Sequence, residues 1–246
     1  MTGRINFKTS NIEKKTLSFG STYASYKSEE YGRLVGNITE MFRDDLNWEA
    51  LADHISKDEK PKKIYCYACS DGSEPYSIAM ALITKLGYDK AKKYFPIIAR
   101  DIDENVIASA QKGIIEFNRY DLKRMKDNNV KPLDFFDYRY SYYKKPCKMG
   151  IYKVKEDLKK CVDFKVGDII KDSKTMNFED AVILFRNVWL YIPEVLQQKL
   201  VSTFNQSFKD STSIVVGAID FGSGFKNILK KHKPPVYIDT FNKEVL

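Results

Sequence analysis

From residue 62 onward, the chain alternates short apolar runs with segments whose apolar residues recur at helical spacing. The apolar runs have the length and composition of buried strands and lie at residues 64–68, 95–101, 162–166, 181–185 and 213–219. Apolar residues recur every three or four positions in the predicted helices at residues 75–86, 104–112 and 193–208, and shorter helices are predicted at 118–129 and 133–137. This alternation predicts an α/β fold with a mostly parallel sheet that helices cover on both faces.

Two regions depart from the alternation. Residues 1–60 are polar at first and then carry a helical repeat at residues 41–55, so we expect a short helical N-terminal segment. The main domain is expected at residues 61–246. Within it, at about residues 138–160, tyrosines alternate with polar residues, which predicts a small antiparallel β insertion.

Residues 62–77, K-K-I-Y-C-Y-A-C-S-D-G-S-E-P-Y-S, combine a strand, a glycine-containing turn and the start of a helix. Gly72 allows backbone amides to approach a ligand closely because it has no Cβ. Ser73 is expected to cap the helix, with Pro75 in its first turn. The segment lacks the phosphate-loop motif and the full G-x-G-x-x-G fingerprint, so the pattern favours a ligand with an adenosine but no pyrophosphate.

Acidic and polar residues follow several of the predicted strands. In parallel sheets, ligands bind at the carboxyl ends of the strands near the switch point. Asp101 ends the second strand and is placed to accept hydrogen bonds from ribose hydroxyls, whereas Asp103 is expected to cap the next helix. Asp168 beside Ile169 suits an adenine amino group and ring face. Residues 186–187, an arginine and an asparagine, would be costly after a buried strand unless they face a site or bond locally.

The bulk composition is compatible with one α/β domain. Of the 246 residues, 43% are hydrophobic and 30% charged. A net charge of +8 favours a polyanionic partner or reflects solvated lysines. No apolar run is long enough to span a bilayer and no secretion signal is evident, so we expect a cytoplasmic protein without membrane insertion. Cys66 and Cys69 lack a second pair to complete a metal site, so no metal is expected.

Four segments, in order, resemble the motifs of one enzyme family. Residues 37–43, N-I-T-E-M-F-R, resemble N-x-T-x-F-F-R, and residues 67–77 resemble A-G-C-S-x-G-E-E-P-Y-S. Residues 101–103 match D-I-D, and residues 186–192, R-N-V-W-L-Y-I, resemble R-N-V-x-I-Y-F. These motifs are typical of the CheR-type chemotaxis receptor methyltransferases, which use S-adenosylmethionine to esterify glutamate side chains on receptor helices.

The resemblance implies a Rossmann-like sheet of the class I methyltransferase type, with S-adenosylhomocysteine as product and acidic receptor helices as partners. It implies that Arg43 and Tyr191 are catalytic by orienting the acceptor, that Glu74 holds the methionine amino group, and that Asp101 binds the ribose. The cofactor-binding residues it implies are Asn37, Thr39, Arg43, Ala68, Glu74, Asp101, Asp168, Ile169, Asn187 and Val188. Ala68 and Ser73 replace a glycine and a glutamate of the family motif.

The chemistry implied by the resemblance needs no general base, because a glutamate with a pKa of about 4.3 is already an anion at neutral pH. This agrees with the two histidines, His54 and His232, both outside the motifs. Two alternatives remain open. The substitutions at Ala68 and Ser73 are compatible with a non-catalytic cofactor-binding module. The positive charge is compatible with a nucleic-acid methyltransferase, but R-N-V at residues 186–188 differs from the D/N-P-P-Y/F motif of base-modifying enzymes, so no stable nucleic-acid complex is expected.

Overall fold

A seven-stranded sheet forms the centre of the molecule. The computed structural model describes residues 25–27, 34–36, 39–140, 150–207, 211–217, 220, 236–239 and 244–245. The strands are β3 (Lys63–Tyr67), β4 (Ile97–Asp101), β8 (Val162–Val166), β9 (Ala181–Leu184), β10 (Ser213–Val215), β11 (Val236–Asp239) and β12 (Glu244–Val245). Their order is β12-β11-β10-β9-β3-β4-β8, and only β11 and β12 pair antiparallel. The predicted mostly parallel sheet is therefore confirmed.

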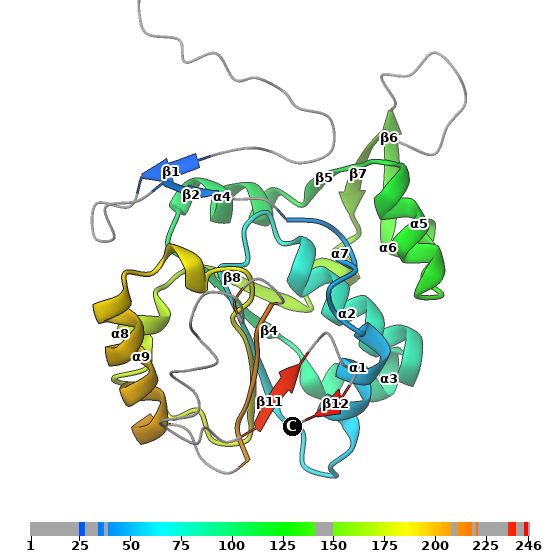
Figure 1. The fold of residues 1–246 in the computed structure, drawn as a ribbon. Helices are drawn as coiled ribbons and strands as arrows, with labels where there is room; N and C mark the ends of the chain where they lie inside the picture. Colours follow the sequence, from blue (N-terminus) through cyan, green and yellow to red (C-terminus); the bar gives the residue numbers. More distant parts are fainter. Residues whose placement is uncertain are drawn as a thin grey trace, which may run out of the picture.

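Helices cover both faces of this sheet (Figure 1). One face carries α1 (Trp48–Ser56), α2 (Ser73–Leu86), α3 (Tyr88–Ala91) and α4 (Glu104–Lys112), and the other carries α8 (Ile169–Asp172) and α9 (Glu194–Ser207). Side chains of β3 alternate between two separate apolar clusters, with Ile64 and Cys66 in the first and Tyr65 and Tyr67 in the second. Because successive residues of a strand point to opposite faces, both sides of β3 are buried.

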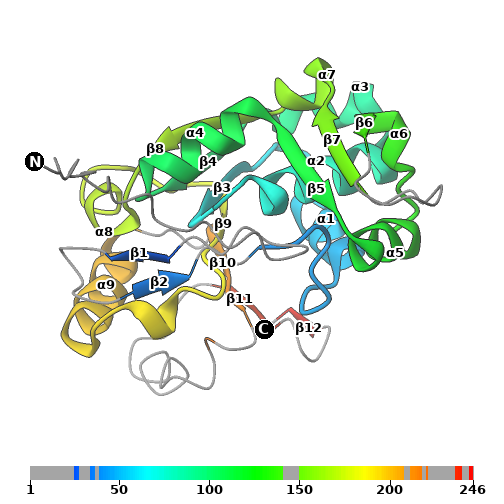
Figure 2. The ribbon, with the colours of Figure 1, turned by 90° about the horizontal axis from the view of Figure 1, so that it is seen from above.

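A second, three-stranded antiparallel sheet contains β5 (Ile114–Phe117), β7 (Gly150–Val154) and β6 (Phe136–Tyr140), in that order. Figure 2 shows it with α5 (Arg119–Asp127) and α6 (Pro132–Phe135) beside it, away from α8 and α9, and α7 (Glu156–Lys159) follows β7. The sheet is larger than the predicted insertion at residues 138–160, because β5 also pairs with β7. The ring of Phe117 in β5 packs with its centre 4.8 Å from that of Phe136 and 4.6 Å from that of Tyr152. Residues 141–149 lie outside the described residues.

The leading segment differs most from expectation. The predicted helix at residues 41–55 begins only at Trp48, since Phe42 has a φ of 48° and Asn47 caps the helix by accepting from the amide of Ala50 at 3.1 Å. The described residues before 37 contain two short antiparallel strands, β1 (Ser25–Lys27) and β2 (Leu34–Gly36), instead of helix.

Two differences from the prediction, the strands β1 and β2 and the later start of β4, have local causes. Tyrosine and valine in β1 and β2 favour strands. Similarly, β4 begins at Ile97 rather than at residue 95, because Pro96 has no amide hydrogen to donate to a neighbouring strand. Strands β11 and β12 were not predicted. Within the described residues, no helix is long and apolar enough to cross a bilayer.

Candidate functional site

The turn after β3 is built from left-handed residues. Ala68, Ser70 and Gly72 have φ values of 56°, 50° and 92°. A Cβ on Gly72 would lie 2.8 Å from Cζ of Phe164, so the glycine is needed for close packing against β8. Non-glycine residues in the left-handed region carry a cost of about 1–2 kcal/mol each. The chain keeps two such residues at the carboxyl end of its central strand, and such local strain is concentrated at functional sites.

The start of α2 is capped differently from the prediction. Gly72 occupies the N-cap position, and Ser73 is the first helical residue. The carboxylate of Asp71 accepts hydrogen bonds from the amide of Ser73 at 2.9 Å and from its hydroxyl at 2.7 Å. The predicted N-cap role of Ser73 is therefore wrong, because the acidic side chain two positions earlier already satisfies the helix amide.

Asp101 lies at the tip of β4 and is 5% exposed. Its two oxygens accept from the amide of Ser70 at 2.9 Å and from the amide of Asp103 at 3.0 Å. Burial raises the pKa of Asp101, and these amide hydrogen bonds oppose that rise. A carboxylate has about four acceptor positions, so these backbone amides, with that of Ile102, leave capacity for a ligand hydroxyl. The cap predicted for α4 is confirmed, since Asp103 accepts from the amide of Asn105 at 2.9 Å.

A buried cluster of three charges joins the carboxyl ends of β3 and β9. The guanidinium of Arg186 has no exposed side-chain surface and donates to Glu74 at 2.8 Å and to Asp45. It also lies 5.7 Å from the ring centre of Trp48. Two carboxylates against one guanidinium give the cluster a net negative charge. The sequence singled out Arg186 but not its partner Asp45, because their contact spans 141 positions.

Both carboxylate oxygens of Glu74 are engaged within the protein. One accepts from Arg186, and the other accepts from the thiol of Cys66 at 3.6 Å. Burial raises the pKa of Glu74, while the charge of Arg186 opposes the rise. Burial likewise raises the pKa of the Cys66 thiol. A ligand ammonium at Glu74 would therefore share this carboxylate with Arg186.

The loop after β9 is shaped by a single aspartate. Asp220 accepts from the amides of Asn187 at 2.7 Å, Val188 at 3.1 Å and Trp189 at 3.0 Å. It also accepts from the amide of Gly217 at 2.7 Å. These bonds hold Asn187 at a φ of 59°. Sequence reasoning missed Asp220, since nothing in the local pattern connects it to a loop more than 30 positions earlier.

The side chain of Asn187 has one buried atom without a protein partner. Its amide nitrogen lies 3.4 Å from Asp45, but its Oδ1 is buried and has no hydrogen-bond partner among the described residues. A Cβ at Gly217 would come within 2.2 Å of this oxygen, so the close approach requires glycine. Buried polar atoms are normally paired. An acceptor of this kind, beside a net negative cluster, fits a ligand that carries donors and positive charge.

A small hollow of about 60 Å³ lies at the carboxyl ends of the central strands. Its lining includes five residues that the sequence assigned to the site and one next to Asp101, namely Ala68, Asp168, Ile169, Val188, Tyr191 and Ile102. These residues come from segments that follow β3, β4, β8 and β9. Asp168 has a second role that was not predicted, because it caps α8 by accepting from the amide of Ile170 at 2.9 Å.

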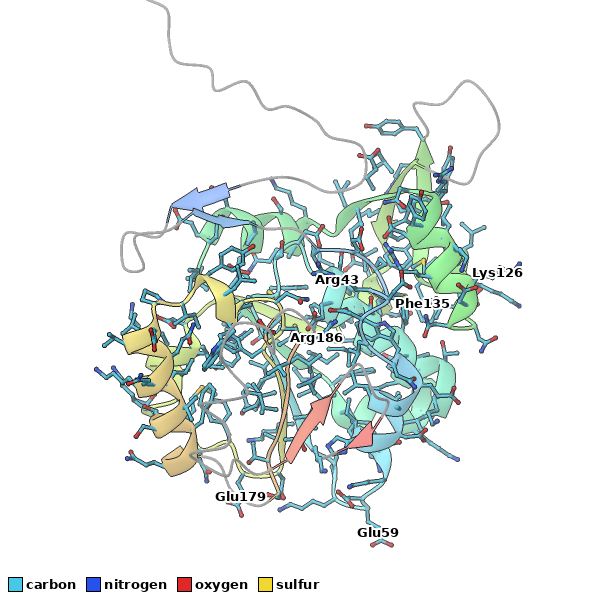
Figure 3. The ribbon with its side chains drawn as sticks, viewed as in Figure 1. Arg43, Glu59, Lys126, Phe135, Glu179 and Arg186 are labelled. Atoms are coloured by element: carbon cyan, nitrogen blue, oxygen red, sulfur yellow. The ribbon has the colours of Figure 1, made fainter. Side chains whose placement is uncertain are left out.

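The segment before α1 approaches the same end of the sheet. Figure 3 shows Arg43 on the same side of the molecule as Arg186, and the charge of Arg43 acts on Glu74 to lower its pKa. The amide of Phe42 donates to the hydroxyl of Ser77 in α2 at 2.9 Å, which fixes the segment. Two other residues of this segment were predicted to belong to the site. Thr39 is half-buried, and Asn37 lies outside the described residues.

Comparisons with known proteins agree with this arrangement. Residues 37–238 match the family described as CheR methyltransferase, SAM binding domain. The chain belongs to this family. Its fold class and its cofactor, S-adenosylmethionine, are thereby those that the sequence motifs predicted.

Curated relatives of this chain are named chemotaxis protein methyltransferases. The chain is 28% identical to a chemotaxis protein methyltransferase of Escherichia coli over 184 residues. The matched region covers 75% of this chain and 60% of that protein. The chain is 30% identical over 172 residues to chemotaxis protein methyltransferase 2 of Pseudomonas aeruginosa, covering 68% and 57%. A Salmonella typhimurium counterpart is 25% identical over 198 residues, covering 80% and 64%. The CheR-type chain therefore spans less than two thirds of the length of these relatives.

Proposed function

We propose that this protein transfers a methyl group from S-adenosylmethionine to glutamate side chains of chemotaxis receptors and releases S-adenosylhomocysteine. The observation that carries the proposal is the hollow at the carboxyl ends of the central strands, where five residues that the sequence assigned to the site come together from three separate segments. Family membership and the names of the relatives support the same reaction. The receptor substrate and the methylated residues are part of the proposal.

The cofactor-binding roles follow from chemistry at each position. Asp101 would bind the ribose hydroxyls, while Asp168 and Ile169 would contact the adenine. Asn187 would use its buried Oδ1, which lacks a protein partner, and Glu74 would face the methionine amino group. When bound, S-adenosylmethionine supplies an electrophilic methyl group on a positively charged sulfur.

The buried charges favour such a ligand. Arg186 pairs with two carboxylates, Glu74 and Asp45, so the three side chains together carry one net negative charge. Charge interactions are strengthened where water is excluded. The cluster therefore stabilises a cationic sulfonium more than the neutral thioether that remains after transfer, which favours product release.

The acceptor side of the site needs orientation rather than proton removal. A glutamate is ionised at neutral pH, so one of its oxygens attacks the methyl carbon directly while the carbon–sulfur bond breaks. Arg43 would orient this carboxylate through its positive charge, and Tyr191, which lines the hollow, would restrict its position. Holding the reacting atoms in line lowers the barrier by removing the entropy cost of bringing them together.

The proposed partners are acidic helices of receptor cytoplasmic domains, so we propose that the protein acts in the cytoplasm. A net charge of +8 favours approach to such helices. Stable nucleic-acid binding is not part of the proposal.

The experiment that tests the proposed function identifies the bond that forms. The protein is incubated with S-adenosylmethionine labelled in the methyl group and with receptor cytoplasmic fragments, and the product is treated with mild alkali. A carboxyl ester releases volatile labelled methanol, which is the expected result. Alkali-stable label would indicate nitrogen or nucleic-acid methylation, and cofactor binding without any transfer would favour a non-catalytic module.

A further inference from the structure

A second pocket lies at the opposite end of the central sheet from the hollow. It has a volume of about 290 Å³ and is formed beside the first residues of β3 and β10 and just before β9. Its lining includes His54, Lys57, Asp58, Lys60, Lys62 and Asp180. In Figure 3, Glu59 and Glu179 mark this end of the molecule, far from Arg43 and Arg186. The methyl-transfer proposal uses none of these residues.

The lining of this pocket restricts the kind of ligand it accepts. All eight lining residues are polar or charged, so an apolar ligand would leave their hydrogen bonds unmet. In the part of the chain that the structure describes, no three His, Cys, Asp or Glu side chains are grouped so that they could hold a metal ion. The volume approaches the lower end of small-molecule sites, about 300 Å³. A small polar ligand fits these properties.

The charges around the pocket favour an anion. Lys62 is only 8% exposed and pairs with Asp58 at 3.0 Å, while Lys60 pairs with Asp180. Lys57 has no carboxylate partner among the described residues. Three lysines therefore meet two aspartates in the lining, which leaves one positive charge in excess there, and the charge of Glu179 acts on Lys60 from outside the lining.

His54 also lines this pocket and has a polar ring atom without a partner in the described residues. The residue is 5% exposed, and its Nε2 lies 2.7 Å from the hydroxyl of Ser213, whereas its Nδ1 is buried without a partner in the described residues. Burial, with added contributions from Lys62 and Lys57 and opposed by Asp58, lowers the pKa of His54 to about 4. When the serine hydroxyl donates to Nε2, Nδ1 carries a hydrogen that is free to donate.

We propose that this pocket binds a phosphate group, held by the Nδ1–H of His54 and by the ammonium of Lys57, the lysine of the lining that has no carboxylate partner among the described residues. Lysine ammoniums bind phosphate as point charges, and a neutral imidazole donor completes the set. Inorganic phosphate and a nucleoside monophosphate share this chemistry. This proposal is independent of the methyl-transfer reaction.

Nuclear magnetic resonance of the histidine ring nitrogens tests the proposal. The chain has two histidines, so His232→Gln leaves a single ring signal, that of His54. This protein is titrated with inorganic phosphate and, separately, with adenosine monophosphate, with sodium chloride keeping the ionic strength constant. We expect a saturable shift of the His54 signals and an upward displacement of its pKa, because a bound anion stabilises the protonated ring.

Two lysine variants make the result specific. Lys57→Gln is expected to weaken phosphate binding by at least about fivefold, as loss of a charged hydrogen bond implies. Lys126→Gln, on the distant helix α5 (Figure 3), is the matched control and should leave binding unchanged. Tighter binding of the nucleotide than of inorganic phosphate would identify a nucleotide as the ligand. A shift that does not saturate, or that is the same in Lys57→Gln, would overturn the proposal.

Discussion

Ala68 is a residue of the site whose backbone conformation is strained. It stands at a φ of 56°, at the end of the central strand and in the lining of the hollow. Glycine adopts this conformation without the steric cost that alanine has, which gives a physical reason for the glycine in the family motif at this position. The alanine that replaces the motif glycine therefore causes local backbone strain but does not change where the carboxyl end of β3 lies.

Replacing this residue tests the strain directly. Ala68→Gly should raise the free energy of unfolding by about 0.5–1 kcal/mol, since the relief of strain exceeds the added chain entropy. Chemical denaturation measures the change. Ala108→Gly, at an exposed position of α4, is the matched control and should lower stability by about 1 kcal/mol. Equal destabilisation by both substitutions would contradict the strain.

His54 predicts a dependence of stability on pH. In the unfolded chain a histidine titrates near 6.5, whereas burial lowers the pKa of His54 to about 4 in the fold. Between these values only the unfolded chain binds the proton, so the stability present above pH 6.5 falls as the pH drops toward 4, by about 2–3 kcal/mol.

The measurement is the free energy of unfolding at pH 7 and pH 4.5 in phosphate-free buffer. His54→Gln removes the titrating group. The free energy of unfolding should therefore change less between the two pH values in this variant, even if loss of the contact with Ser213 lowers its stability at both. His232→Gln is the control. The account of His54 is wrong if both variants keep the full dependence.

At the scale of elements, the segment before α1 is held to the sheet by Asp45. This aspartate connects residues 39–47 to Arg186 at the end of β9, and the amide of Phe42 connects them to α2. Because Arg43 belongs to the same segment, the ion pair of Asp45 fixes the backbone that carries the proposed orienting charge. Asp45 acts on the reaction by positioning and by its charge.

Asp45→Asn should weaken binding of S-adenosylmethionine by about fivefold, the effect of losing roughly 1 kcal/mol of charge interaction, and should change binding of S-adenosylhomocysteine less. The reason is that the substitution neutralises the cluster that attracts the sulfonium. Calorimetry with both nucleosides measures the ratio. Asp44→Asn is the matched control, because Asp44 is 81% exposed and faces Arg124 instead. Equal losses for the two nucleosides would show that the charge does not discriminate between them.

The loop after β9 gives a second prediction for an element. Gly217→Ala places a methyl group 2.2 Å from Oδ1 of Asn187 and should displace that side chain. Cofactor affinity is expected to fall by at least about tenfold, with stability reduced by about 1–3 kcal/mol from overpacking. Calorimetry and denaturation together measure both effects. Unchanged cofactor affinity would argue against a role of Asn187 in binding.

Elements with local signals were predictable, and those fixed by distant contacts were not. Helix α4 was predicted with its observed bounds because Asp103 caps its start and Gly113, in the left-handed region, ends it. The segment around Phe42 carries a helical repeat but turns away from helix, since its amide is bound by Ser77 in α2. Local pattern cannot report a partner 35 positions away.

At the scale of the whole molecule, the order of strands decides where the site lies. Strand β3 is flanked by β9 on one side and β4 on the other. The chain adds β4 and β8 on one side of β3 and the later strands on the other side, so the topological switch point lies at β3. The motifs and the predicted strand ends together indicated most of the residues around that point. Asp45, Arg186 as a buried bridge, and Asp220 were missed, because their roles come from contacts that close only when the whole chain has folded.

The central claim is that S-adenosylmethionine binds across the carboxyl ends of the central strands. A crystal structure with S-adenosylhomocysteine bound tests it most directly. We predict the ribose at Asp101, the adenine between Asp168 and Ile169, and the amino acid end beside Asn187. A nucleoside bound at another part of the molecule, or crystals that stay free of it at saturating concentration, would contradict the account.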